Sequence, residues 1–279
     1  MRRSMVVLAF GWLVGCAEWS LFAEGDRSVG SPNSGWLERG ATIGERGEGY
    51  VRSRPGDATR FGHARLVAAI EAASANVARA YPGGAPLRVG DLAGDGGGEH
   101  ERHASHRTGR DADLAFYVTD MSGRSISGAS AAFDRHGISR DSSGTLVRFD
   151  VARNWELVRT FLADDRAAVQ WIFCSNGVKA LLLRHARRVE SDPDVLVRAA
   201  AVLHQPSNGR SHDDHFHVRI TCDARDRALG CRDYGPRWPW TRRAIDAPDV
   251  ASVADDRAVL DYLGPASSDD DAGATTTND

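Results

Sequence analysis

The chain lacks any excess of basic charge. Its 279 residues carry 35 Lys and Arg against 38 Asp and Glu, which gives a formal net charge of −3, and Lys179 is the only lysine. A surface without a basic excess does not concentrate nucleic-acid phosphates or anionic lipid headgroups around the protein. We therefore expect no nucleic-acid partner.

Long apolar runs are also missing. The run over residues 5–14 is too short to cross a bilayer as a helix, and it follows two arginines, as in a secretory signal. It ends in Leu-Val-Gly-Cys at residues 13–16, which resembles the bacterial lipobox, in which the cysteine thiol receives a diacylglycerol. We expect a lipoprotein signal peptide over residues 1–15 and a lipid on Cys16. An ordinary cleaved signal with a chance cysteine is the alternative.

The residue after this cysteine bears on location. Ala17 stands where an aspartate would favour retention in the inner membrane. The resemblance to lipoproteins therefore implies a periplasmic protein attached to the outer membrane through the lipid on Cys16. Durable anchoring takes more than one acyl chain, because each buried CH₂ contributes only about 0.8 kcal/mol.

Cysteine is scarce, with four in the chain. Apart from Cys16, they are Cys174, Cys222 and Cys231. In an oxidising compartment, Cys222 and Cys231 are expected to form a disulfide, because they bracket a short turn-rich segment. Cys174 ends the apolar run over residues 169–174, which predicts a buried and unreactive thiol.

Apolar residues are present in sufficient number for a folded core, since 42% of the chain is hydrophobic. Disordered and collagen-like classes are thereby excluded. The polar segment over residues 16–33 is predicted to be a flexible tether, and residues 265–279, which include three consecutive aspartates, a disordered acidic tail. Between them we find no repeat and no linker, so we expect one domain over residues 34–264.

Helical and strand patterns alternate without a repeated unit. Apolar residues recur at helical spacing from Leu66 to the Pro-Gly-Gly turn at residues 82–84, and Asp150 and Asp192 stand where they could cap helices. The mixture predicts the α+β class, with a central, mainly antiparallel sheet flanked by helices. Strands are predicted over residues 87–92, 113–118, 169–174 and 215–221, and helices over residues 66–80, 150–161, 175–186 and 192–204.

Six of the ten histidines fall in two clusters. The first cluster comprises His100, His103 and His106, and the second comprises His212, His215 and His217. In the second cluster, His215 and His217 alternate with apolar residues, so a strand would place both imidazoles on one face while Phe216 points into the core. Two imidazoles on one face can point at a common centre, which favours a metal site on the face of the sheet.

A carboxylate completes a possible ligand set. Asp113 follows His106 by seven residues, after the turn signal Thr-Gly-Arg at residues 108–110, so the loop can fold the two side chains together. A catalytic zinc ion takes three protein ligands, of which nitrogen and carboxylate oxygen are typical, and a water. His106, Asp113 and one histidine of the second cluster supply such a set, although these donors also suit other divalent ions.

Two stretches carry a resemblance to a known family. Residues 105–113 (SHRTGRDAD) and 211–219 (SHDDHFHVR) resemble the two zinc motifs of penicillin-insensitive murein endopeptidases. The likeness extends to Ser-Pro-Asn at residues 31–33, Arg-Val-Gly-Asp-Leu at residues 88–92 and Trp-Ile-Phe at residues 171–173, and so covers most of residues 30–222. It is weakest after Cys222.

The resemblance implies roles for individual residues. His106, Asp113 and His217 match the first, second and third zinc ligands of the family. His215 matches its catalytic histidine and His212 a further active-site histidine. His103 aligns with a histidine of the family's loop, whereas His100 is expected to be a solvated loop residue because three ligands are already supplied.

The implied activity is that of a monomeric zinc metallopeptidase acting on peptidoglycan stem peptides. Zinc (Zn²⁺) would make water a nucleophile near neutral pH, His215 would take its proton and return it to the leaving amine, and His212 would stabilise the oxyanion if protonated. The family's substrate is the D-alanyl-diaminopimelyl cross-link. The alternatives are a D,D-carboxypeptidase or dipeptidase with the same site, and a binding module that holds peptidoglycan without cutting it.

Several neighbouring residues have two possible roles. Asp213 and Asp214 either orient the histidines or are solvated turn carboxylates. Arg107 and Arg110, beside the first motif, could bind a substrate carboxylate. The aromatic stretch over residues 238–240 is expected to pack against the domain, and lining a substrate groove is the alternative.

Overall fold

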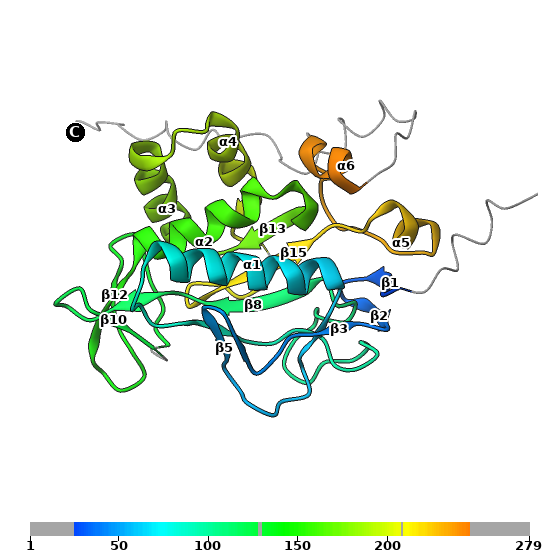
Figure 1. Ribbon diagram of the computed structural model, residues 1–279, viewed down its shortest axis with the longest axis horizontal. Coiled ribbons are helices and arrows are strands. Elements are labelled where there is room, and N and C mark those ends of the chain that lie inside the picture. The colour runs from blue at the N-terminus through cyan, green and yellow to red at the C-terminus, as the bar shows by residue number, and fades with distance from the viewer. Residues whose placement is uncertain (1–24, 128–129, 208, 246–279) are drawn as a thin grey trace, which may run out of the picture.

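A computed structural model describes residues 25–127, 130–207 and 209–245 (Figure 1). The predicted signal peptide (1–15), Cys16 with its predicted lipid and the predicted tail (265–279) lie outside the described residues. Within the described ranges, every helix is too short or too polar to cross a membrane.

A seven-stranded sheet organises the domain. Four of its neighbouring pairs are antiparallel, and only β14/β13 and β7/β5 are parallel. The predicted α+β fold with a central, mainly antiparallel sheet is therefore confirmed. In spatial order the strands are β14 (Leu203–His204), β13 (Val169–Phe173), β15 (His215–Ile220), β8 (Asp111–Ala115), β7 (Leu87–Val89), β5 (Tyr50–Arg52) and β4 (Arg46–Gly47).

The four longest helices gather on one side of this sheet (Figure 1). They pack against its apolar face, where Leu114, Phe216 and Val218 are at most 1% exposed. Burial of one face by helices leaves the other face of β8 and β15 for polar side chains, which alternate with the buried ones. The helices are α1 (Ala64–Ala80), α2 (Val151–Ala163), α3 (Asn176–Val189) and α4 (Pro193–Val202).

Side-chain caps explain where the helices begin. The carboxylate of Asp150 accepts a hydrogen bond from the backbone N–H of Arg153 at 3.2 Å. Ser175 caps α3, and Asp192 caps α4 just before a proline in the first turn. These caps satisfy N–H groups that have no partner within the helix, so the capping signals at Asp150 and Asp192 and the predicted helix start at Ser175 are confirmed.

The predicted strands differ from the observed ones at their ends. β8 begins at Asp111, two residues before the prediction, and stops at Ala115, because β9 (Val118–Thr119) joins a separate sheet. β7 stops at Val89, three residues short. The separate sheet was not predicted, since its strands are short; it comprises β10 (Ser125–Ile126), β9, β12 (Leu146–Phe149) and β11 (Ile138–Arg140).

The folded domain includes residues that the sequence assigned to the tether over residues 16–33. β1 (Arg27–Ser31) pairs with β2 (Ser34–Glu38), and Gly30 exchanges backbone hydrogen bonds with Gly230 and Arg232 at 3.1 and 2.9 Å. The Ser28 hydroxyl also donates to the Thr108 carbonyl at 2.6 Å. The tether prediction is wrong for residues 27–31 because backbone pairing and one buried serine stabilise a segment that has little apolar patterning.

Short elements complete the domain. They are β3 (Ala41–Thr42), which pairs with β6 (Phe61–Gly62), a 3₁₀ turn (Asp165–Ala167), α5 (Ala224–Ala228) and α6 (Pro239–Ile245). The Trp238 ring stacks on Trp240, and its Nε1 donates to the Gln170 carbonyl at 2.7 Å. The packing role expected for this aromatic stretch is therefore the one observed.

The three cysteines among the described residues lie as the sequence predicts. Cys222 and Cys231 form a disulfide across α5 and the following turn. Cys174 is fully buried, and burial raises the pKa of its thiol to about 12. The thiol is therefore protonated at neutral pH and unreactive.

Replacement of Phe216 by alanine tests the role of the apolar face beneath β15. The fully buried Phe216 ring packs edge-to-face on Phe116, with the ring centroids 4.7 Å apart. Phe216→Ala should lower the free energy of unfolding by about 3–5 kcal/mol, because it removes transfer energy and leaves a cavity. Urea denaturation measures this change. The control Val197→Ala, at a side chain that is 62% exposed, should shift stability by less than about 0.5 kcal/mol. A loss below about 1 kcal/mol in Phe216→Ala would contradict this account.

Candidate metal centre and active site

The register of two neighbouring strands brings the motif residues together. β8 and β15 are antiparallel, with Asp113 opposite His217 and Ala115 opposite His215. Opposed residues in such a pair project to the same face, so Asp113, His215 and His217 all stand on the face away from the four helices. The sequence predicted this shared face for the two histidines.

The three predicted zinc ligands lie together, because ring nitrogens of His106 and His217 both lie close to one carboxylate oxygen of Asp113. Asp113 Oδ1 lies 3.3 Å from His106 Nε2 and 3.4 Å from His217 Nδ1. The rings of His106 and His217 meet edge-to-face with centroids 4.6 Å apart. All three residues are buried, with at most 8% exposure. Strand and loop segments a hundred residues apart in the sequence therefore meet at one point.

Unpartnered atoms indicate that this cluster is suited to a cation. Both ring nitrogens of His106 and Asp113 Oδ1 are buried without a hydrogen-bond partner among the described residues. A buried polar atom without a partner costs about 1–3 kcal/mol, and a charged one more. A divalent ion would satisfy the carboxylate oxygen and one imidazole nitrogen together, and two imidazoles with one carboxylate are donors that zinc accepts. The residues present therefore fit the predicted metal.

His103 is a further candidate ligand. Its Nε2 lies 3.3 Å from Asp113 Oδ2 and 2.9 Å from Asp91 Oδ2. The potential ligand atoms of His103, His106 and Asp113 all lie within 4.8 Å of one another. The loop that carries His103 therefore offers a ligand nitrogen in addition to the three predicted ligands. The resemblance indicated His103 only as a residue that aligns with a loop histidine of the family.

His100 is not the solvated loop residue that the sequence predicted. Its ring lies 4.8 Å from that of His103 and 5.6 Å from that of His106, between ring centroids, and its Nε2 is buried. Burial lowers the pKa of His100 to about 4, with the neighbouring histidines adding to the effect. The glycine-rich loop folds over the site and carries His100 inward, which spacing alone did not reveal.

Asp111 fixes the orientation of His217. The fully buried Asp111 places Oδ1 2.7 Å from His217 Nε2 and 2.5 Å from Arg219 Nε. An ionised carboxylate accepts the proton on Nε2, which leaves Nδ1 as the lone-pair nitrogen towards Asp113. Burial lowers the pKa of His217 to about 4, although Asp111 acts in the other direction. The ring is therefore neutral at pH 7, as metal binding requires. Sequence reasoning missed Asp111, although it lies in the first motif.

His215 faces the cluster from its solvent side. Its Nε2 lies 3.5 Å from Asp113 Oδ1 and its Nδ1 lies 2.6 Å from Asp214 Oδ1. Burial lowers the pKa of His215, but the neighbouring carboxylates of Asp113 and Asp214 outweigh burial and raise it to about 10. Of the two aspartates that could orient a histidine, Asp214 makes that contact, while the backbone carbonyl of Asp213 accepts from the Phe133 N–H at 2.7 Å.

His212 lies beside the two histidines of β15. Its ring centroid is 5.2 Å from that of His215 and 5.4 Å from that of His217. Burial, followed by the charge of His215, lowers the pKa of His212. The predicted protonated donor is therefore disfavoured, and a neutral imidazole with one N–H is the form that this environment supports.

Two of the site histidines have unusual backbone conformations. His106 has φ of 67° and His212 has φ of 49°. Left-handed backbone at a non-glycine residue costs of order 1–3 kcal/mol and persists where the surroundings impose it. The hydrogen bond from the Ser175 N–H to the His212 carbonyl, at 2.9 Å, is one such contact.

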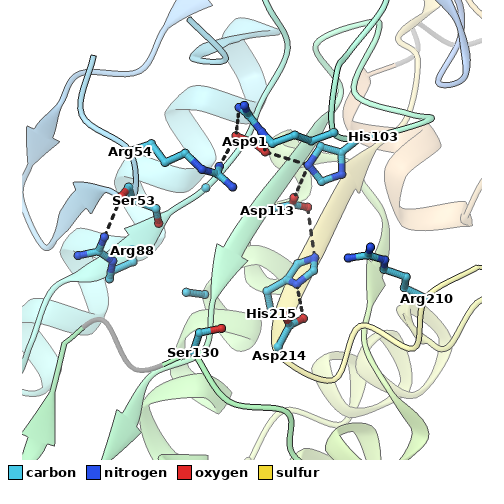
Figure 2. A pocket seen from close by; sticks show the side chains of 13 residues that line it. Ser53, Arg54, Arg88, Asp91, His103, Asp113, Ser130, Arg210, Asp214 and His215 are labelled. Carbon is cyan, nitrogen blue, oxygen red and sulfur yellow. Dashed lines mark hydrogen bonds and ion pairs between the residues drawn. The ribbon is translucent and has the colours of Figure 1, made fainter. Parts of the chain in front are cut away.

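A cavity of about 680 Å³ opens beside these residues (Figure 2). Asp113 and His215 lie in its wall, with Asp91 and His103 above them in the view. Gly90 allows β7 to approach Asp113 closely, since a Cβ at that position would lie 3.1 Å from the Asp113 side chain. The cavity is large enough for part of a peptide and places the candidate catalytic histidine at its surface.

The two arginines expected to bind a substrate carboxylate do not reach this cavity. Arg110 is fully buried and pairs with Asp233 at 2.6 Å. Arg107 donates from Nε to the Ala104 carbonyl. The prediction is wrong for Arg110 because its guanidinium ties β8 to the segment after the disulfide, and neither arginine is among the residues that line the cavity.

One other group with metal-ligand distances lies outside the cavity, among the residues described. His63, which the sequence gave no reason to select, lies 3.0 Å from Asp26 and 3.3 Å from Asp226, with Asp223 at 3.8 Å. These contacts join the start of α1 to the residue before β1 and to α5, and we interpret the group as an ion-pair network of the fold.

Comparison with known proteins agrees with the motifs. The model of the penicillin-insensitive murein endopeptidase family matches residues 28–237. The penicillin-insensitive murein endopeptidase of Haemophilus influenzae is 28% identical over 221 residues, which cover 75% of this chain and 67% of that protein. The matched region contains the whole candidate site and the seven-stranded sheet. The chain therefore belongs to the penicillin-insensitive murein endopeptidase family.

Proposed function

We propose that the protein is a zinc metallopeptidase that hydrolyses the D-alanyl-diaminopimelyl amide cross-links of peptidoglycan. Membership of the murein endopeptidase family supports a peptidoglycan hydrolase. The observation that carries the metal chemistry is the convergence of His106 Nε2 and His217 Nδ1 on Asp113 Oδ1, a buried oxygen with no hydrogen-bond partner among the described residues.

His106, Asp113 and His217 would hold the ion, and His103 is close enough to add a nitrogen. Zinc, when bound, supplies Lewis acidity, which makes water nucleophilic near neutral pH and polarises an amide carbonyl. The hydrogen bond between His217 Nε2 and the Asp111 carboxylate keeps His217 in the tautomer that presents the Nδ1 lone pair to the proposed metal. A low local dielectric strengthens each of these interactions, because the ligands are buried.

His215 is the proton carrier in this proposal. Its Nε2 faces Asp113, and its Nδ1 is held by Asp214. A cation bound at Asp113 would repel the imidazolium and so oppose the carboxylates that raise the pKa of His215. Nε2 would then accept a proton from the attacking water and return it to the leaving amine.

His212 would bind the developing negative charge on the substrate oxygen through a neutral N–H. A preorganised donor of this kind contributes about 3–4 kcal/mol of transition-state stabilisation. The adjacent Phe173 ring, 5.9 Å from His212 between centroids, limits how far the imidazole can turn.

We further propose that the protein acts as a monomer in the periplasm, anchored to the outer membrane through a lipid on Cys16. The lipobox-like sequence supports this location. Cells fed a radiolabelled fatty acid should label the wild-type protein, and Cys16→Ser should remain unlabelled and be released from the membrane fraction. Labelling of the variant, or membrane release of the wild type, would refute the anchor.

Metal removal tests the proposed chemistry directly. Protein lacking residues 1–16 should convert cross-linked muropeptide dimers to monomers, lose that activity in a chelator and regain it with zinc. Chromatography of the products and metal analysis of the same sample measure both. Release of free D-alanine alone would instead indicate a carboxypeptidase, and binding without any product a binding module.

Two variants control this experiment. His106→Ala should lose both zinc and activity, because it removes a ligand. His136→Ala, at an exposed histidine outside the cavity, should keep both. Full activity in metal-free wild-type protein would rule out the metal mechanism.

Asp111→Asn tests the role of the hydrogen bond between Asp111 and His217. The change keeps the size of the side chain but removes the charge that accepts the Nε2 proton, so zinc affinity should fall about 10–100-fold. Titration against a competing chelator measures the affinity, and circular dichroism checks that the variant is folded. An affinity within about twofold of the wild type would show that Asp111 serves only to neutralise Arg219.

A further inference from the structure

Four arginines and three aspartates are among the residues that line the cavity. Two of the arginines are already neutralised. Arg54 pairs with Asp91 at 2.7 Å, and Arg102 donates to Asp91 and to Asp57 at 2.9 Å. Their role is to hold Asp91, which in turn contacts His103. They are therefore part of the support of the site.

The other two arginines have no acidic partner among the described residues. Arg88 makes one side-chain hydrogen bond, to the Ser53 carbonyl at 2.9 Å. The exposed guanidinium of Arg210 makes no side-chain hydrogen bond or ion pair within the described part of the chain. Figure 2 shows them on opposite sides of His215.

The sheet fixes the distance of Arg88 from the candidate catalytic histidine. Val89 lies opposite Leu114, which places Arg88 beside Ala115, and Ala115 lies opposite His215. Arg88 and His215 are thus two strands apart, which is roughly 10 Å between their backbones. The small side chain of Ala115 leaves the floor between them open. Two or three extended peptide residues span about 7–10 Å, so Arg88 can meet a group close to the scissile bond.

The positive charges of Arg88 and Arg210 favour an acidic group of the substrate beside each arginine. The two aspartates that belong to the site, Asp113 and Asp214, are engaged by histidines. A divalent cation at Asp113 would make the cavity more positive. A planar guanidinium without an acidic partner can bind a carboxylate through two parallel hydrogen bonds, which gives both affinity and orientation.

We propose that Arg88 and Arg210 bind two carboxylates of the substrate, one on each side of the scissile amide. This inference rests on the proposed peptidase function and specifies its substrate class. The enzyme would select peptides with a free carboxylate on both the acyl and the amine side, and would discriminate against peptides in which either group is a carboxamide.

Four synthetic cross-linked peptides test the proposal: both carboxylates free, the acyl side amidated, the amine side amidated, and both amidated. For the zinc-loaded wild type, each amidation should lower kcat/KM about tenfold, because a neutral amide cannot replace a charged bidentate partner. Arg88→Gln should lose sensitivity to amidation on one side only, and Arg210→Gln on the other side only.

Further variants separate charge from general damage. Arg210→Lys keeps the charge but loses the planar fork, so it should retain part of the discrimination. Arg187→Gln, at an exposed position on α3, should behave as the wild type on all four peptides.

The outcomes are distinguishable. If the wild type cleaves none of the peptides, the proposed function fails. If it cleaves all four equally, or if either glutamine variant loses activity equally on all four, the function stands and the carboxylate subsites are refuted.

Discussion

The pairing register of β8 and β15 is the constraint on which the site depends. It sets Asp113 against His217 on one face and Leu114 against Phe216 on the other. A slip of one residue would move the imidazoles and the carboxylate into the core and expose the phenyl ring. The apolar face therefore does more than stabilise the domain, because its burial against the helices holds the polar residues in alignment.

Burial of charged side chains on the polar face of the sheet costs free energy. Buried charges there are balanced in pairs, with Asp111 between His217 and Arg219, and Asp91 between Arg54, Arg102 and His103. Removal of one member of such a pair leaves the other uncompensated in a low dielectric. Atoms of His106 and Asp113 are among those that this balance leaves without a hydrogen-bond partner in the described part of the chain, and these are the atoms at which we propose that the metal binds.

Much of this arrangement could be predicted from the sequence, and the rest could not for definite physical reasons. The alternation around Phe216 predicts a strand with both histidines on one face, and the caps at Asp150 and Asp192 predict helix starts, because these are local signals. Asp111 was missed since its contacts are with His217 and Arg219, far along the chain. His100 was missed since its contacts with His103 and His106 depend on how the loop folds. The strand over residues 27–31 was missed because backbone pairing leaves no mark in an apolar pattern.

The left-handed backbone at His106 and His212 has an evolutionary consequence. Glycine or asparagine would relax the main chain at both positions, so each imidazole is placed there at a conformational cost to its own residue. In the mechanism that we propose, thermal robustness and turnover are therefore opposed at these two sites. Selection of the enzyme for heat resistance alone would be expected to erode the histidines there before it touched the sheet beneath.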